Sequence, residues 1–161
     1  MQREISGFRQ DEADDWVAEL RCHHRQHVRH RPPFHPLAWV ETAQGRSEHV
    51  GTTLDCPLCD RAELPDGLVV AHTAGPFDES SLPPGLRRDH RVADGTWAVV
   101  RVLSGLARFT MRTVPHMSFD LRSGESQPIP PGVPHAVALT AGSIEVDFLV
   151  PPSAAADEQH R

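Results

Sequence analysis

The sequence predicts a small zinc-stabilised α+β domain followed by an all-β domain, and two observations predict this division. All three cysteines lie in the first part of the chain, beside a run of histidines. Beyond Leu64-Pro65-Asp66-Gly67 the chain changes to short apolar segments separated by proline and glycine, as expected of strands joined by turns. We therefore expect domains at 1–65 and 66–151, with a small polar tail at 152–161 that is disordered.

The first domain is predicted to contain a hairpin and a short helix. Trp16–Leu20 has the aromatic and branched residues of a strand, and 27–31 is the expected returning strand. Cys22 and His24 would then lie at or near the tip. A second turn at 54–63 leads into a short helix, and this combination is typical of a treble-clef or zinc-ribbon-like module.

The cysteines and histidines of this domain have the spacing of a tetrahedral zinc site. Two thiolates from Cys56 and Cys59, one from Cys22 and the imidazole of His24 would complete it, and His27 is the alternative histidine. Four protein ligands leave no open position, which favours a structural Zn²⁺ over a catalytic one. The other interpretations are free buried cysteines, or a redox CxxC, which lacks its usual βαβ context here.

Two motifs in this region point to a known family. The run CHHRQHVRHRPPF, which begins at Cys22, and CPLCD, which begins at Cys56, resemble a bacterial family of unknown function. The resemblance covers residues 7–65. It implies a metal-binding module and no established activity.

The second domain is predicted to be built from strands alone. Seven segments have the length and composition of strands, and this spacing favours a sandwich or barrel. They are 68–72, 95–103, 107–111, 118–121, 127–129, 136–139 and 143–150.

A short motif near the end of the chain refines this prediction. The stretch from Gly124 through Pro130-Pro131-Gly132 to His135 resembles the second motif of the cupin superfamily, a double-stranded β-helix or jelly-roll barrel. Val102-Leu103-Ser104-Gly105 resembles the turn of the first cupin motif. The usual glutamate position is occupied by Ala98, so a site of three histidines and one glutamate is not expected.

The whole segment 66–151 resembles the small cupin domain of the tellurite-resistance protein B family, through LRRDHRVADGTWAVVRVLSG, VPHAV and EVDFLV. The resemblance implies metal ligands at His90, His135 and Asp147. Glu145 is the alternative carboxylate, because period-two alternation places it on the same strand face as Asp147. The implied ion is a divalent Zn, Fe, Ni or Mn, with coordination positions open to a small-molecule or oxyanion ligand.

Charge and hydropathy exclude several function classes. The formal net charge of −6 is divided evenly between 1–64 and 65–161, so nucleic acid is not a favoured partner. No apolar run is long enough to span a bilayer and the amino terminus lacks a signal-peptide core, which indicates a cytoplasmic protein. Barrels of this kind pair through edge strands, which favours a homodimer.

The sequence leaves three functions open. The first is a metal-binding protein of bacterial stress response or of tellurite and oxyanion resistance. The second is a regulatory protein whose barrel senses a ligand and whose zinc module contacts a partner or nucleic acid through Arg21, Arg25, Arg29 and Arg31. The third is a metal-dependent oxygenase.

Overall fold

The computed structural model describes residues 1–29 and 37–158, and of 156–158 the backbone alone. Residues 30 and 31 of the strand predicted at 27–31, Arg31 among them, and the end of the predicted tail lie outside the described residues. The chain forms two compact units, Met1–Pro57 and Leu58–Arg161. Within the described ranges, no helix is long and apolar enough to cross a membrane.

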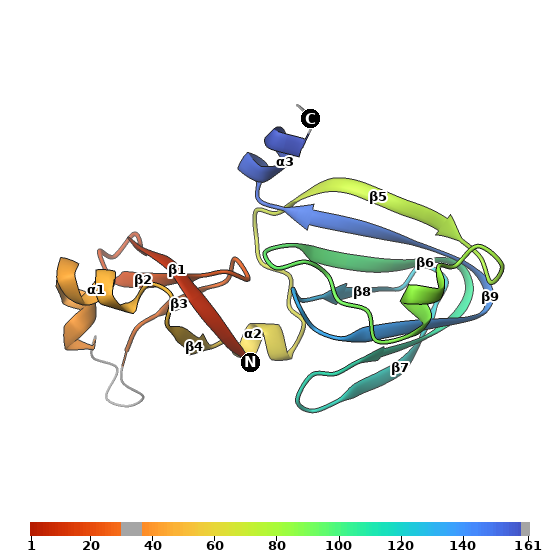
Figure 1. The fold of residues 1–161 in the computed structure, drawn as a ribbon, viewed down its shortest axis with the longest axis horizontal. Coiled ribbons are helices and arrows are strands. Elements are labelled where there is room, and N and C mark those ends of the chain that lie inside the picture. The colour runs from red at the N-terminus through yellow and green to blue at the C-terminus, as the bar shows by residue number, and fades with distance from the viewer. Residues whose placement is uncertain (30–36, 159–161) are drawn as a thin grey trace. The chain divides into compact units, whose positions relative to one another are not determined.

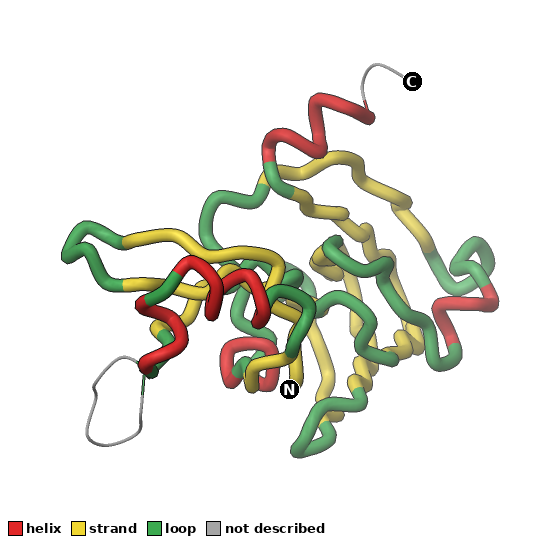
Figure 2. Tube along the Cα trace, turned by 60° about the vertical axis from the view of Figure 1, so that its left-hand side comes forward, coloured by secondary structure: helices red, strands yellow, loops and turns green. Residues whose placement is uncertain are grey.

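The first unit is a four-stranded antiparallel sheet with helical segments after its third strand (Figures 1 and 2). The strand order is β3-β2-β1-β4. The elements are β1 (Gln2–Gln10), β2 (Trp16–Leu20), β3 (Arg25–His27), the 3-10 helix η1 (Ala38–Glu41), α1 (Ala43–His49) and β4 (Thr53–Asp55), and α2 (Pro57–Asp60) begins where this unit ends.

This unit agrees with the predicted hairpin at β2 and differs in three places. The returning strand β3 begins two residues earlier than predicted, and neither β1 nor α1 was predicted. Helix α1 begins because the Thr42 side chain accepts a hydrogen bond from the Gly45 amide at 3.0 Å. Two of its side chains contact aromatic rings, since Arg46 covers the Trp16 ring and His49 stacks on Trp39.

The second unit is a five-stranded antiparallel sheet. Four strands lie in the order β5-β9-β6-β7, and β8 pairs with β6. The elements are β5 (Val69–Phe77), η2 (Pro84–Arg87), β6 (Trp97–Met111), β7 (Met117–Arg122), β8 (Ser126–Ile129), β9 (His135–Val150) and α3 (Pro152–Glu158). Where the sequence led us to expect disorder from residue 152, the chain forms α3.

The strands β6 and β9 are each one long strand where the sequence predicted two. They pair along their whole length, and their backbones approach closely at the paired residues Gly105 and Gly142, a place we call the crossing. Both glycines have positive φ. Each strand contains one extra residue near this crossing, one between Val102 and Ser104 and one between Leu139 and Ala141. An extra residue of this kind is a β-bulge, and it reverses which alternate side chains face the core.

The core of the second unit lies between these curved strands. Its largest fully buried side chains come mainly from β6 and β9, on both sides of the crossing, and include Trp97, Phe109, Met111, Ile129, Val137 and Ile144. Burying aromatic and branched side chains of this size contributes about 1.5–3 kcal/mol each. The first unit has a smaller core, formed by its buried cysteines and by Ile5, Val17, Ala18, Leu20, Val28 and Val40.

Candidate metal centre and cavity

Four sulfur- and nitrogen-bearing side chains converge where the β2–β3 turn meets helix α2. Cys22 and His24 come from the turn, in which the Leu20 amide donates to the His24 carbonyl at 2.9 Å. Cys56 immediately precedes α2 and Cys59 lies within it. All four are buried, and their ligand atoms lie within 4.8 Å of one another. This cluster can hold a metal ion.

The three distances among Cys22, His24 and Cys56 are compatible with a tetrahedral site. Cys22 Sγ lies 3.6 Å from His24 Nδ1 and 3.9 Å from Cys56 Sγ, and Cys56 Sγ lies 3.3 Å from His24 Nδ1. Donor atoms bound tetrahedrally at zinc distances are about 3.4–3.8 Å apart. The backbone therefore presents these side chains at separations that need little change to accept an ion.

The electrostatic environment of His24 is set by the neighbouring sulfurs. Burial lowers the pKa of His24, but its hydrogen bonds and Coulombic interactions with Cys22 and Cys56 outweigh burial and raise the pKa to about 9. A metal bound at Nδ1 replaces the proton there, so metal binding at this cluster releases protons.

The alternative histidine, His27, is not part of this cluster. Its Nε2 pairs with the Asp11 carboxylate at 2.7 Å, and the hydrogen bond with His27 is the main reason that the pKa of Asp11 is lowered. Asp11, Asp15 and His27 form a second group of close oxygen and nitrogen atoms, but it is only half-buried or exposed and Asp15 is already paired with Arg29. We assign no metal to it.

Three of the four arginines proposed to contact a partner lie within the described residues, and all three are already paired with carboxylates. Arg21 contacts Glu4 at 2.7 Å, Arg25 lies 3.6 Å from Glu19, and Arg29 pairs with Asp15. The paired carboxylates reduce the positive potential that a phosphate backbone would require.

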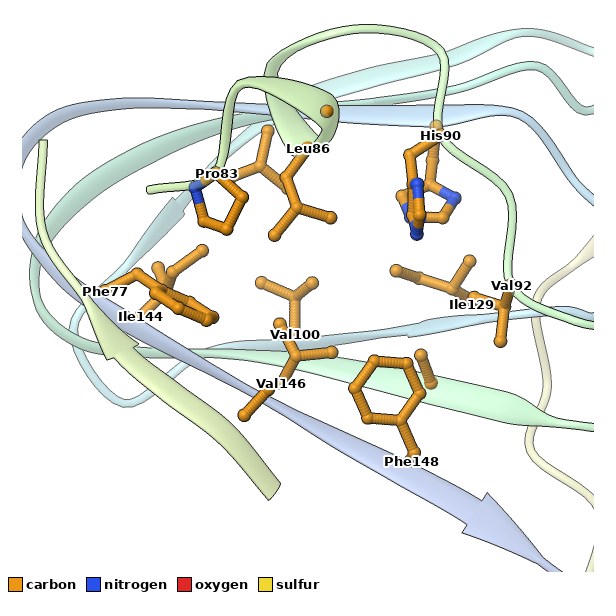
Figure 3. Close-up of a pocket in the computed structure, with 15 residues that line it drawn as sticks. Phe77, Pro83, Leu86, His90, Val92, Val100, Ile129, Ile144, Val146 and Phe148 are labelled. Carbon is orange, nitrogen blue, oxygen red and sulfur yellow. The ribbon is translucent and has the colours of Figure 1, made fainter. Parts of the chain in front are cut away.

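The second unit contains a cavity of about 250 Å³ lined almost entirely by apolar side chains. Figure 3 shows Pro83 and Leu86 on one side of it, and Val100 and Val146 opposite. Its two polar side chains are His90 and His135, whose ring centroids are 5.4 Å apart with the rings nearly perpendicular. The remaining lining residues are Ala74, Phe77, Gly85, Val92, Ala98, Ile129, Val137, Ile144 and Phe148.

The carboxylates expected to join these histidines lie on the other face of β9. Ile144, Val146 and Phe148 face the cavity, so the intervening Glu145 and Asp147 do not. Asp147 is instead buried beside Thr73, which donates to its Oδ1 at 2.6 Å, and it pairs with Arg101. The structure therefore does not bring Asp147 or Glu145 together with His90 and His135, and a metal ion at the two histidines stays a prediction.

The bulge in β9 explains why Asp147 and His135 face opposite sides of the sheet. Simple alternation from His135 places every odd-numbered residue, Asp147 included, on the face of His135. The extra residue between Leu139 and Ala141 reverses the alternation, so Val137 and Val146 both face the cavity.

Replacing Asp147 by asparagine tests its structural role. We expect a loss of about 1–3 kcal/mol in the free energy of unfolding, because a buried carboxylate loses its charge-assisted contact with Arg101, and no change in metal content. Urea denaturation and elemental analysis measure both. The control, Asp120→Asn, removes an exposed pair with Arg108 and is expected to cost less than about 1 kcal/mol. Loss of a metal ion from the Asp147 variant would contradict the assignment.

Sequence reasoning found both histidines of the cavity and missed its apolar lining. The signal was present in Ile144, Val146 and Phe148, which alternate along β9 opposite the carboxylates. The lining contributed by β5 and η2 depends on long-range packing that local patterns do not report.

Two family models match the chain, one in each part. Residues 6–63 match the family described as a protein of unknown function, DUF3565. Residues 72–148 match the TehB-like domain. No curated protein matches the chain.

Three solved structures resemble part of the chain. A protein from E. coli strain K12 is 16% identical, with a TM-score of 0.49 over 56% of this chain and 97% of that chain. TehB from Haemophilus influenzae is 18% identical, with a TM-score of 0.48, and the match covers 58% of this chain but only 35% of the TehB chain. A conserved protein of unknown function from Streptococcus pyogenes is 22% identical, with a TM-score of 0.33 over 50% of this chain and 55% of that chain.

Proposed function

We propose that this chain, in which a DUF3565 domain precedes a TehB-like domain, is a zinc-stabilised protein that binds a small organic molecule in its second unit. The observation that carries the proposal is the apolar cavity of about 250 Å³, which is lined in part by η2 and contains two imidazoles. The cluster of Cys22, His24, Cys56 and Cys59 binds the zinc ion that stabilises the fold.

Zinc is the ion that best suits the Cys22, His24, Cys56 and Cys59 cluster. Three thiolates and one imidazole are a common structural zinc set, and the sulfur and nitrogen separations of 3.3–3.9 Å fit its tetrahedron. Soft thiolate ligands disfavour magnesium, calcium and manganese. With four buried protein ligands the ion has no position for a substrate, so its contribution is to folding.

A cupin-type barrel is the arrangement we propose for the second unit. The tight turn at Pro130-Pro131-Gly132 delivers His135 into the cavity at the start of β9, as the sequence motif predicts. The long antiparallel pairing of β6 with β9 supplies two curved walls of such a barrel.

The composition of the cavity favours a neutral ligand over tellurite or another oxyanion. In the part of the chain that the structure describes, the cavity lining includes no arginine. Burying an anion without a cationic partner costs several kcal/mol. A role in stress response or oxyanion resistance would therefore not involve direct binding of the oxyanion in this cavity.

Toluene is a suitable first probe, because another protein holds benzene in an apolar cavity of about 150 Å³. At about ten times its Kd, toluene is expected to raise the free energy of unfolding by about 1.4 kcal/mol, measured by calorimetry on the full chain. Leu86→Trp, which fills the cavity from η2, should abolish this gain, whereas Val114→Trp at an exposed site should keep it. Equal stabilisation of both variants would contradict the proposal.

A further inference from the structure

The two imidazoles of the cavity are held together by backbone pairing. The His90 amide donates to the His135 carbonyl at 2.8 Å, and the His135 amide donates to the His90 carbonyl at 2.9 Å. This two-residue bridge fixes the side chains next to each other although they are 45 positions apart in the sequence. The cavity therefore has one polar end within an otherwise apolar lining.

The hydrogen bond of His135 with Val133 determines which ring nitrogen faces a ligand. The Val133 carbonyl can only accept, so His135 Nδ1, which lies 3.0 Å from it, carries the hydrogen. In the neutral ring Nε2 is then a hydrogen-bond acceptor. Burial lowers the pKa of His135, the bond to Val133 opposes this shift and the nearby His90 adds to it, so the neutral ring is favoured.

The groups at the polar end select the ligand chemistry. An acceptor at His135 Nε2 requires a donor on the ligand, and the neighbouring His90 ring offers a second nitrogen. A hydroxyl group can both donate and accept, so it suits a pair of imidazoles. Among the described lining residues there is no carboxylate to balance a cation and no arginine to balance an anion, because Asp147 faces the other way. A charged ligand is therefore disfavoured.

We infer that the cavity binds a small neutral molecule with one hydroxyl group on an apolar ring or chain, a phenol or comparable alcohol, whose hydroxyl donates to His135 Nε2 beside His90. The inference rests on the proposed function and adds the ligand class to it. The cavity of about 250 Å³ suits a single ring with small substituents.

The test compares phenol with toluene, which matches it in size and lacks the hydroxyl. Isothermal titration of the full chain is expected to give a Kd for phenol that is about two- to ten-fold lower than for toluene, the range of one net hydrogen bond. Benzoate and tellurite at the same concentrations are expected to give no measurable heat of binding. Equal affinities for phenol and toluene would overturn this inference and leave the proposed function standing, whereas binding of neither probe would overturn both.

The variant His135→Asn tests the role of Nε2 separately from that of Nδ1. An asparagine amide can still donate to the Val133 carbonyl, as Nδ1 does, but it offers nothing at the position of Nε2. The variant is expected to bind toluene within about two-fold of the wild type and to lose the preference for phenol, whereas His116→Asn, at an exposed position, should keep it. A preference retained in His135→Asn would overturn the inference.

Two measurements on the wild type apply even if this variant fails to fold. Nitrogen-15 NMR of the imidazoles is expected to show phenol, and not toluene, shifting the Nε2 resonance of His135. The same shift with both probes would count against the hydroxyl contact. Elemental analysis that finds a second metal ion per chain, bound by the imidazoles of the cavity, would also overturn the inference, because Nε2 would then be a metal ligand.

Discussion

Replacing Cys56 by serine is expected to reduce the metal content from about one zinc ion per chain to almost none and to unfold the first unit. Apparent binding free energies of structural zinc are about 10–16 kcal/mol, as large as the whole stability of an ordinary domain. The core of the first unit beyond the cluster is small, so little remains to keep it folded. Elemental analysis measures the first effect, and amide hydrogen exchange resolved by segment measures the second.

His27→Ala is the matched control for the metal centre. It removes the alternative histidine, whose Nε2 contacts Asp11, and is expected to keep the zinc ion. His24→Ala should lose most of it. Zinc lost from the His27 variant and kept by the His24 variant would show that the assignment of the fourth ligand is wrong. In the Cys56 variant, amides of the β6–β9 pair should exchange as slowly as in the wild type, because the second unit has its own core.

The metal cluster could be predicted from the sequence because its geometry is local. Two cysteines separated by two residues, and a Cys-x-His on a hairpin turn, carry most of their spacing within a few residues of backbone. Only the approach of the two segments had to be assumed. The structure was needed to rule out His27 as the fourth ligand, since it places His27 beside Asp11.

The cavity could be predicted only in part, because its side-chain directions depend on two bulges. The motif around Pro131 and Gly132 placed His135 correctly at a strand start. The alternation of β9 was correct within each half of the strand, but the extra residue near Gly142 changed the face on which Asp147 lies. A single inserted residue leaves almost no pattern in a sequence, yet it moves every later side chain to the other side of the sheet.

Replacing Gly142 by alanine is expected to destabilise the second unit by about 2–5 kcal/mol. A Cβ at this position would lie 2.0 Å from the Ser104 carbonyl oxygen, which is backbone and cannot rotate away, and the φ of 98° is itself unfavourable for alanine. The strained φ costs about 1–2 kcal/mol and the overpacking about 1–3 kcal/mol. Urea denaturation followed by the fluorescence of the buried Trp97 measures the change.

Gly124→Ala separates the clash from the backbone strain. Gly124 also has a positive φ, 86°, but an added Cβ would meet no atom within 4 Å, so only about 1–2 kcal/mol should be lost. The Gly142 variant should in addition bind toluene more weakly, because the clash lies next to the β9 bulge that turns both Val137 and Val146 into the cavity. Equal destabilisation by the two substitutions would mean that the close crossing of β6 and β9 does not exist in solution.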